Sequence, residues 1–283
     1  MPTLILKPTP HTEAAKFLSD KPAVSREVFD RLLPDLQARA ITITGVESTN
    51  VVQAVRDRIA ELPLGADWAE VKHDIAEQIS PWLDQTDGGS DRAERRAELL
   101  LRNHGYQAYA ATKEQVMLRQ RAAFPYAQYQ SAGDSKVRPT HAALDGIIMP
   151  ADSPFWDSHT PPWEWGCRCH KVFLTENDVK DAQGADARRK PEARRVLTPA
   201  EQKRLETGGT LQRADGNGVP RTINVTPRQG SYTWNPRTIT MDVNSLRARY
   251  DAPTWASFES WARQTKINAT LTIWDWLNSQ PNS

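Results

Sequence analysis

Both cysteines of the chain and three of its six histidines fall within residues 134–170. The cysteines stand two residues apart, at Cys167 and Cys169, and His141 lies earlier in the same stretch. Thiolate sulfur and imidazole nitrogen are ligands that zinc prefers, and a structural zinc site normally has four ligands. The pattern therefore supports the hypothesis that His141, Cys167 and Cys169 bind a zinc ion.

Side chains two residues apart on an extended segment point to the same face of that segment. Cys167 and Cys169 can therefore converge on one point, whereas Arg168 and His170 point away from it. This alternation makes His170 a poor candidate for the fourth ligand. Three other side chains in the stretch could complete the site: Asp134, Asp157 or His159.

Two other interpretations of these residues stay open. Cysteine is among the most frequently buried residue types, so both thiols could pack as small apolar groups on a core strand. His141 would then hydrogen-bond a carbonyl oxygen in a turn, and the protein would require no cofactor. A cysteine beside a histidine is also the minimum for nucleophilic catalysis, so Cys167 or Cys169 could act with His141 and an aspartate.

The surrounding sequence gives catalysis little support. No glycine-rich nucleophile turn or oxyanion-hole signature flanks the cysteines. No phosphate-binding glycine loop, HExxH pair or calcium-binding loop occurs in the sequence. We therefore expect a protein that is not an enzyme.

Four aromatic side chains accompany the candidate ligands: Phe155, Trp156, Trp163 and Trp165. Their spacing is too irregular for one face of a helix, and they flank proline turns, including Pro161-Pro162. We expect them to hold loops against the domain core. An aromatic surface for a protein partner is the alternative, because exposed tryptophan is enriched in binding hot spots.

The overall composition limits the functional classes. The chain has 283 residues, enough for two domains, and its 36 lysines and arginines almost balance its 35 aspartates and glutamates. Charge alone therefore does not support DNA binding. The N-terminal apolar run is only three residues long, at residues 4–6, so we expect no signal peptide and no membrane partner.

The elements around the stretch are indicated by hydrophobic periodicity and capping residues. Helical patterns cover residues 12–40, where Pro34 should kink or split the helix, and residues 49–62, 68–79 and 92–120. Asp67 with Glu70 forms a capping-box pattern before the third of these helices. Alternation from residue 126 to 131 predicts a strand that leads into the stretch.

The remaining residues give weaker patterns. Residues 176–206 are charged and helix-forming. Residues 206–230 are interrupted by glycine and proline, which is typical of a loop or extension with at best short strands. Residues 238–243 suggest a strand. A Trp-rich helical end comes after them, in which Trp255, Phe258 and Trp261 are spaced as one helix face.

The order of residues from 134 to 170 resembles the phage Mu F-like (SPP1 gp7-like) head morphogenesis family. The resemblance covers about residues 92–175. It rests on an aspartate and a basic, proline-containing turn, then a histidine, a glycine, an aromatic segment, a Pro-Pro turn and a closing Cys-Arg-Cys. The matching residues are Asp134, Arg138, Pro139, His141, Leu144, Gly146, Phe155, Trp156, Pro161, Pro162, Cys167, Arg168 and Cys169. Many relatives carry a histidine or asparagine where this chain has Trp163-Glu164-Trp165-Gly166, which removes one candidate ligand.

The resemblance implies a minor head protein in few copies at the portal vertex, needed during procapsid assembly. Its implied partners are the portal protein, the scaffold or the major capsid protein. Its implied location is the virion head, after assembly in the host cytoplasm. Some relatives contact packaged DNA and some related domains are fused to toxins, but the balanced charge and the absence of a catalytic motif support neither here.

These patterns together predict an α+β protein with three regions. Residues 1–90 form a helical N-terminal region, and residues 91–175 form a small mixed Mu F-like domain. Residues 176–283 form an extension with a charged connector and the Trp-rich helical end.

Overall fold

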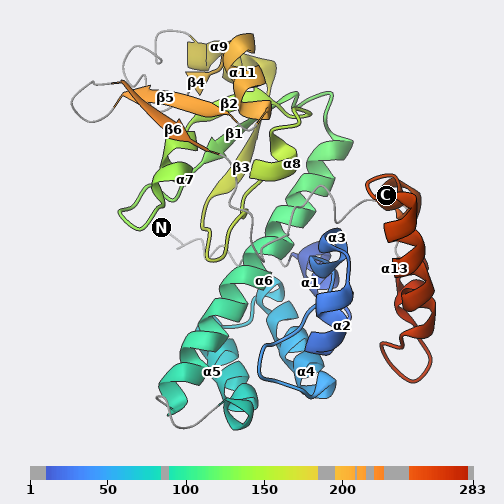
Figure 1. The fold of residues 1–283 in the computed structure, drawn as a ribbon. Helices are drawn as coiled ribbons and strands as arrows, with labels where there is room; N and C mark the ends of the chain where they lie inside the picture. Colours follow the sequence, from blue (N-terminus) through green and yellow to red (C-terminus); the bar gives the residue numbers. More distant parts are fainter. Residues whose placement is uncertain are drawn as a thin grey trace. The chain divides into compact units, whose positions relative to one another are not determined.

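The computed structural model describes residues 11–83, 89–183, 195–207, 209–214, 220–225 and 242–279. The chain divides into two compact units, whose elements are labelled in Figure 1. Met1–Thr112 and Thr238–Ser283 form the first, which we call the helical unit, and Lys113–Arg237 form the second, the sheet unit. Helices at both ends of the chain and a small central sheet confirm the predicted α+β class. The division into regions 1–90, 91–175 and 176–283 stays a prediction from the sequence.

Short helices open the helical unit because prolines interrupt the helical pattern. Pro34 occupies the first turn of a new helix, so the chain splits there as expected, and a second break lies before Ser25, whose hydroxyl caps the next helix. The elements of this part are α1 (Thr12–Ser19), α2 (Arg26–Arg31), α3 (Pro34–Gln37), α4 (Thr49–Ala60), η1 (Leu62–Leu64), α5 (Trp68–Ile79), η2 (Ser80–Trp82) and α6 (Gly89–Arg119).

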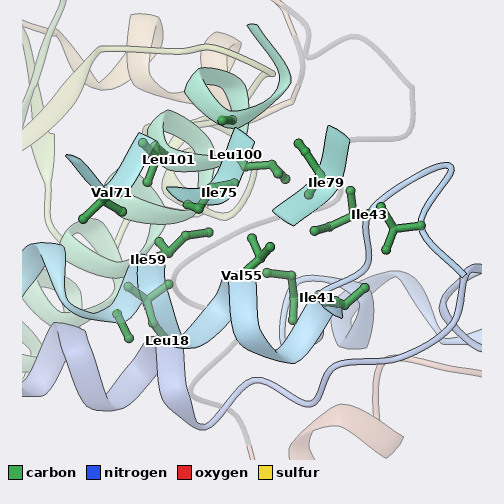
Figure 2. Close-up of a cluster of buried hydrophobic side chains, with 14 of the residues drawn as sticks. Leu18, Ile41, Ile43, Val55, Ile59, Val71, Ile75, Ile79, Leu100 and Leu101 are labelled. Carbon is green, nitrogen blue, oxygen red and sulfur yellow. The ribbon is translucent and has the colours of Figure 1, made fainter. Parts of the chain in front are cut away.

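The apolar faces of α4 and α5 pack together in the core of the helical unit, as their periodicity predicts. Figure 2 shows this core, in which Val55 and Ile59 of α4 lie near Val71 and Ile75 of α5. All four side chains are fully buried, and Leu101 of α6 joins them. Burial of these faces supplies most of the stability of such short helices, because isolated helices of this length are marginal in water.

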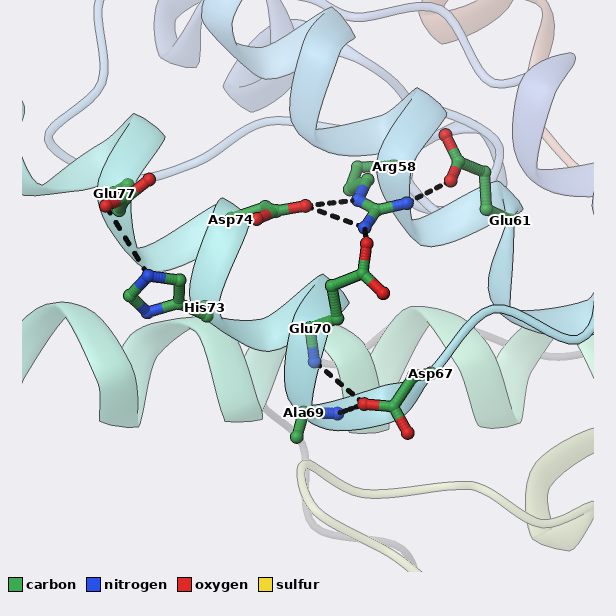
Figure 3. Close-up of polar contacts among 8 residues, drawn as sticks. All are labelled: Arg58, Glu61, Asp67, Ala69, Glu70, His73, Asp74 and Glu77. Carbon is green, nitrogen blue, oxygen red and sulfur yellow. Dashed lines mark hydrogen bonds and ion pairs between the residues drawn. The ribbon is translucent and has the colours of Figure 1, made fainter.

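Polar contacts also join α4 to α5. Arg58 of α4 pairs with Glu61, which caps the end of α4, and with Glu70 and Asp74 of α5, as Figure 3 shows. The Asp67 carboxylate accepts hydrogen bonds from the first turn of α5, at 2.9 and 3.0 Å, so the Asp67 half of the predicted capping box is present. Glu70 turns toward Arg58, with 2.9 Å between its Oε1 and Nη2 of Arg58.

Helices from the C-terminal end complete the helical unit. They are α12 (Val243–Arg247), α13 (Ala252–Gln264) and α14 (Ile273–Ser279). Trp255 and Phe258 of α13 are buried in an apolar cluster that also contains Leu32 and Leu36 from the N-terminal part. The predicted strand at 238–243 lies mostly outside the described residues, and Val243 begins α12.

The sheet unit contains a 4-stranded sheet in the order β3-β1-β2-β4. The strand β1 is antiparallel to both neighbours, and β2 runs parallel to β4. The strands are β1 (Tyr126–Gln130), β2 (Ile147–Pro150), β3 (His170–Leu174) and β4 (Arg195–Val196). The helices of this unit are α7 (Pro139–Leu144), α8 (Trp156–His159), α9 (Glu176–Gln183) and α11 (Pro199–Glu206).

This sheet separates two apolar clusters. Ala127 and Tyr129 of β1 face the larger cluster, and Tyr126 of β1 packs with Ile148 of β2 on the other side. The alternation of β1 therefore has the predicted period of two. The larger cluster contains both cysteines and the buried aromatic residues of the stretch.

A β-hairpin lies within residues 206–230, where glycine and proline suggest a loop. Strands β5 (Thr210–Ala214) and β6 (Pro220–Asn224) pair antiparallel, with Leu211 opposite Ile223. Leu211 and Val225 are buried in the larger cluster, so tertiary packing stabilises strands that the local sequence disfavours.

Among the described helices, none is long and apolar enough to span a membrane.

A buried ion pair ties β3 to the last part of α6 within the sheet unit. The Nζ of Lys171 lies 2.5 Å from Oε2 of Glu114, and both side chains are almost fully buried. The same Nζ lies 4.8 Å from the ring centres of Trp156 and Phe173. The ammonium group is therefore held between one carboxylate and two aromatic faces.

The substitution Glu114→Gln should destabilise the protein by about 3–5 kcal/mol, because it leaves a buried ammonium without its carboxylate. Adding Lys171→Met should recover part of that loss. Urea unfolding followed by circular dichroism measures both effects. Arg121→Gln, which removes an exposed ion pair with Asp152, is the control and should cost at most about 1 kcal/mol. A double variant less stable than Glu114→Gln alone would contradict the expectation.

A second buried lysine lies in the helical unit. The Nζ of Lys21 donates a hydrogen bond of 3.2 Å to Oε1 of Gln107 and lies 5.0 Å from the ring centre of Phe17. Burial lowers the pKa of Lys21 to about 7. Because an unfolded lysine keeps its proton up to about pH 10.4, unfolding takes up a proton between these pH values. Stability should therefore rise with pH across this window.

Lys21→Met should raise the free energy of unfolding most at about pH 7 and below, where the folded protein buries the charged ammonium. The gain should shrink as the pH rises toward 10, by at most about 1.4 kcal/mol per pH unit. Urea unfolding at several pH values measures it. Lys16→Met, at an exposed lysine paired with Asp20, is the control and should show no such trend. A gain from Lys21→Met that is independent of pH would contradict the lowered pKa.

Candidate functional site

The structure brings His141, Cys167 and Cys169 together, as the metal hypothesis requires. His141 comes from α7, and the two cysteines come from the segment that leads into β3. The Nδ1 of His141 lies 3.5 Å from Sγ of Cys167 and 3.6 Å from Sγ of Cys169. The three candidate ligand atoms lie within 4.8 Å of one another, and all three side chains are buried.

A fourth side chain, Tyr129 of β1, reaches the same nitrogen. Its hydroxyl oxygen lies 3.2 Å from Nδ1 of His141 and accepts a hydrogen bond of 2.8 Å from Nε1 of Trp163. Tyr129 is completely buried. The sequence places Tyr129 on a strand, but no motif marks it as part of a site, because its contribution depends on how β1 faces α7.

Two glycines and one proline set the positions of these side chains. Pro139 occupies the first turn of α7, where its missing N–H costs nothing. Gly146 follows α7 with φ +77° and donates its N–H to the carbonyl oxygen of Tyr129 at 2.8 Å, which holds the helix end against β1. Gly166 turns the chain toward the cysteines with φ +69°, a conformation that other residues adopt only with strain.

The segment Trp163–Gly166 covers the histidine. The Trp163 ring stacks on His141 with ring centres 4.3 Å apart. Oε2 of Glu164 lies 3.4 Å from Nε2 of His141 and 3.1 Å from Nε of Arg138. Phe155, Trp156 and Trp163 are buried as expected, but Trp165 is 48% exposed, so that tryptophan does not hold a loop against the core.

The other three candidate ligands lie elsewhere. Asp134 makes a bidentate pair with Arg168, at 2.6 and 2.7 Å, and this hydrogen bonding lowers the pKa of Asp134 to about 2. Asp157 is exposed. Nε2 of His159 lies 2.6 Å from the carbonyl oxygen of Val225. The pairing of Arg168 and the exposure of His170 agree with the expected alternation around the cysteines.

The two thiols affect each other's ionisation. A hydrogen bond from the Cys167 thiol lowers the pKa of Cys169, and the same bond, with burial, raises the pKa of Cys167. Burial raises the pKa of the Tyr129 phenol well above its usual value. A thiolate can act either as a metal ligand or as a nucleophile.

The comparisons with known proteins concern the same region. Residues 39–172 match the family described as Phage Mu protein F like protein, a range that contains all four clustered side chains. The chain is 28% identical over 156 residues to the Mu-like prophage FluMu F protein of Haemophilus influenzae, covering 52% of this chain and 38% of that protein.

A second relative comes from Escherichia phage Mu and is named "Putative capsid assembly protein F". It is 27% identical over 161 residues, which cover 53% of this chain and 37% of that protein. The matched part of the chain thus spans less than two fifths of either relative. No solved structure matches the chain.

The family match begins well before residue 92, so it includes α4 and α5 as well as the cysteine-containing stretch. Both curated relatives carry the F protein name of Mu or of a Mu-like prophage. Residues 39–172 of this chain therefore match the Phage Mu protein F like family, the resemblance that the order of residues from Asp134 to Cys169 predicts.

Proposed function

We propose that this chain is a minor head protein of a tailed bacteriophage, which acts structurally in procapsid assembly at or near the portal vertex. The observation that carries the proposal is the family match over residues 39–172, together with a relative from phage Mu whose name describes capsid assembly. The portal protein, the scaffold or the major capsid protein are the proposed partners. The evidence for an assembly role is the name of that relative.

Burial of the clustered side chains supports a role without catalysis. His141, Cys167 and Cys169 are 1%, 4% and 8% exposed, and Tyr129 is not exposed at all. A nucleophile must reach its substrate, so thiols this deeply buried are poorly placed for attack on a macromolecule. The same burial is typical of groups that fix the positions of neighbouring segments.

One arrangement favours a second candidate function, a cysteine-dependent enzyme. The Cys167 thiol, the His141 ring and the Glu164 carboxylate are arranged in sequence at 3.5 and 3.4 Å, the order of a nucleophile, a base and the group that orients the base. Opening of the segment Trp163–Gly166 would be required before a substrate could reach that thiol.

Co-expression of the full chain with the portal, scaffold and major capsid genes of the same phage tests the assembly role. The chain should sediment with procapsids in a gradient and copurify with the portal protein, in few copies per particle. Omitting the portal gene should remove it from the particles if its docking site is at the portal vertex. A chain that stays in the soluble fraction when procapsids form would contradict the proposal.

Single substitutions of the thiols separate the structural role from the enzymatic one. If the cluster is structural, Cys167→Ala and Cys169→Ala should lower the melting temperature and the amount of chain in procapsids together. If one thiol is a nucleophile, its substitution should leave incorporation intact and block a later step of head maturation. Tyr106→Ala, at an exposed position of α6, is the control for general effects of substitution.

A further inference from the structure

We propose that the cluster in the sheet unit is a closed tetrahedral zinc site, with Tyr129 as the fourth ligand beside His141, Cys167 and Cys169. The ligand atoms would be Nδ1 of the histidine, both Sγ atoms and the phenolic oxygen. This proposal does not depend on the assembly role, because it concerns what stabilises the fold of the unit.

The crowding around one nitrogen is the first reason. Nδ1 of His141 has three polar heavy atoms near it, at 3.2 Å from Tyr129, 3.5 Å from Cys167 and 3.6 Å from Cys169. A neutral imidazole nitrogen either donates one hydrogen bond or accepts one, so it cannot satisfy three such neighbours. A cation placed among the four atoms would satisfy all of them at once.

The separations of the other three ligand atoms from Nδ1 match those of a zinc site. With Zn–S about 2.3 Å and Zn–N about 2.0–2.1 Å, tetrahedral geometry separates nitrogen from sulfur by about 3.6 Å. With Zn–O about 2.0 Å, it separates nitrogen from oxygen by about 3.3 Å. The observed separations from Nδ1 are 3.5 and 3.6 Å to the sulfurs and 3.2 Å to the phenolic oxygen.

The other ring nitrogen lies near a carboxylate, the kind of group toward which metal-bound histidines usually direct it. A ligating histidine almost always directs its second nitrogen at a carboxylate, a carbonyl or a water, which fixes the ring. Nε2 of His141 lies 3.4 Å from Oε2 of Glu164, which Arg138 holds at 3.1 Å. The Trp163 ring covers the imidazole, so the ring cannot rotate freely.

Tyr129 completes the set and closes it. Its oxygen accepts a hydrogen bond from Nε1 of Trp163, which would stabilise negative charge on a metal-bound phenolate. Four protein ligands leave no open position for water or substrate, which is the pattern of structural rather than catalytic zinc sites. The ion would join β1, α7 and the segment before β3, three parts of the chain that are separate in sequence.

The test uses the full chain, purified with a tag that does not bind metal and in the presence of a reductant. Mass spectrometry should find about one zinc ion per chain. Removing the ion with a strong chelator should lower the melting temperature, and adding zinc should restore it. Co²⁺ in place of zinc should give the intense visible absorption of a tetrahedral site and a thiolate-to-metal charge-transfer band.

Two histidine variants provide a matched comparison. His141→Gln should remove the zinc, whereas His159→Gln, at a buried histidine of the same unit whose Nε2 contacts a backbone carbonyl, should retain it. Glu164→Gln should weaken zinc affinity about 10–100-fold, the usual effect of losing an outer-shell carboxylate. Tyr129→Phe should weaken it at least tenfold and shift the visible bands of the Co²⁺ form.

Several outcomes would overturn the proposal. Folded protein with reduced thiols that contains no zinc and takes up neither Zn²⁺ nor Co²⁺ would exclude the site. A zinc ion retained in His141→Gln would place the metal elsewhere. Unchanged affinity and an unchanged Co²⁺ spectrum in Tyr129→Phe would exclude tyrosine as the fourth ligand. If His141→Gln fails to fold, the chelator and Co²⁺ measurements on the unmodified protein still decide whether the chain binds a metal at a tetrahedral site with thiolate ligands.

Discussion

The fold of the sheet unit depends on how three buried side chains, Tyr129, Cys167 and Cys169, meet at one imidazole nitrogen of His141. Burying such groups costs free energy unless each finds a partner, so the segments that carry them must bring these side chains into contact. Three local features meet this constraint: the turn at Gly146, whose N–H bonds to β1 and holds the end of α7 there, the turn at Gly166, and the Trp163 ring stacked on His141. The Lys171–Glu114 ion pair then fixes β3 just beyond the cysteines.

The sequence predicts the elements that local periodicity determines. The helices α4 and α5, the Asp67 cap, the split at Pro34 and the alternation of β1 all agree with expectation, because each depends on residues within one or two turns. The α+β class is set by the same elements. Local patterns do not show long-range packing. The β5–β6 hairpin, which tertiary packing stabilises, therefore lies where glycine and proline suggest a loop. The packing of Trp255 against N-terminal helices is likewise a tertiary contact.

The same distinction applies to the candidate site. Residue type and two-residue spacing identify Cys167 and Cys169 as converging side chains, and His141 as their partner. Tyr129 and Glu164 join them only because β1 and the Trp163–Gly166 segment fold against α7. The segment Trp163–Gly166 lacks the histidine or asparagine that many relatives carry there. Its tryptophan and glutamate contact His141 instead, although neither is a proposed ligand. On the proposed function, a rigid cluster of this kind would hold one face of the unit in shape for assembly with other head proteins.

X-ray absorption at the zinc edge, on the purified full chain, tests the central claim most directly. Two sulfur neighbours at about 2.3 Å and two nitrogen or oxygen neighbours at about 2.0–2.1 Å are the expected first shell. Replacement of Tyr129 by phenylalanine should change the oxygen contribution and leave both sulfur neighbours in place. A first shell without sulfur, or a sample without a zinc signal, would contradict the claim that His141, Cys167, Cys169 and Tyr129 bind one ion.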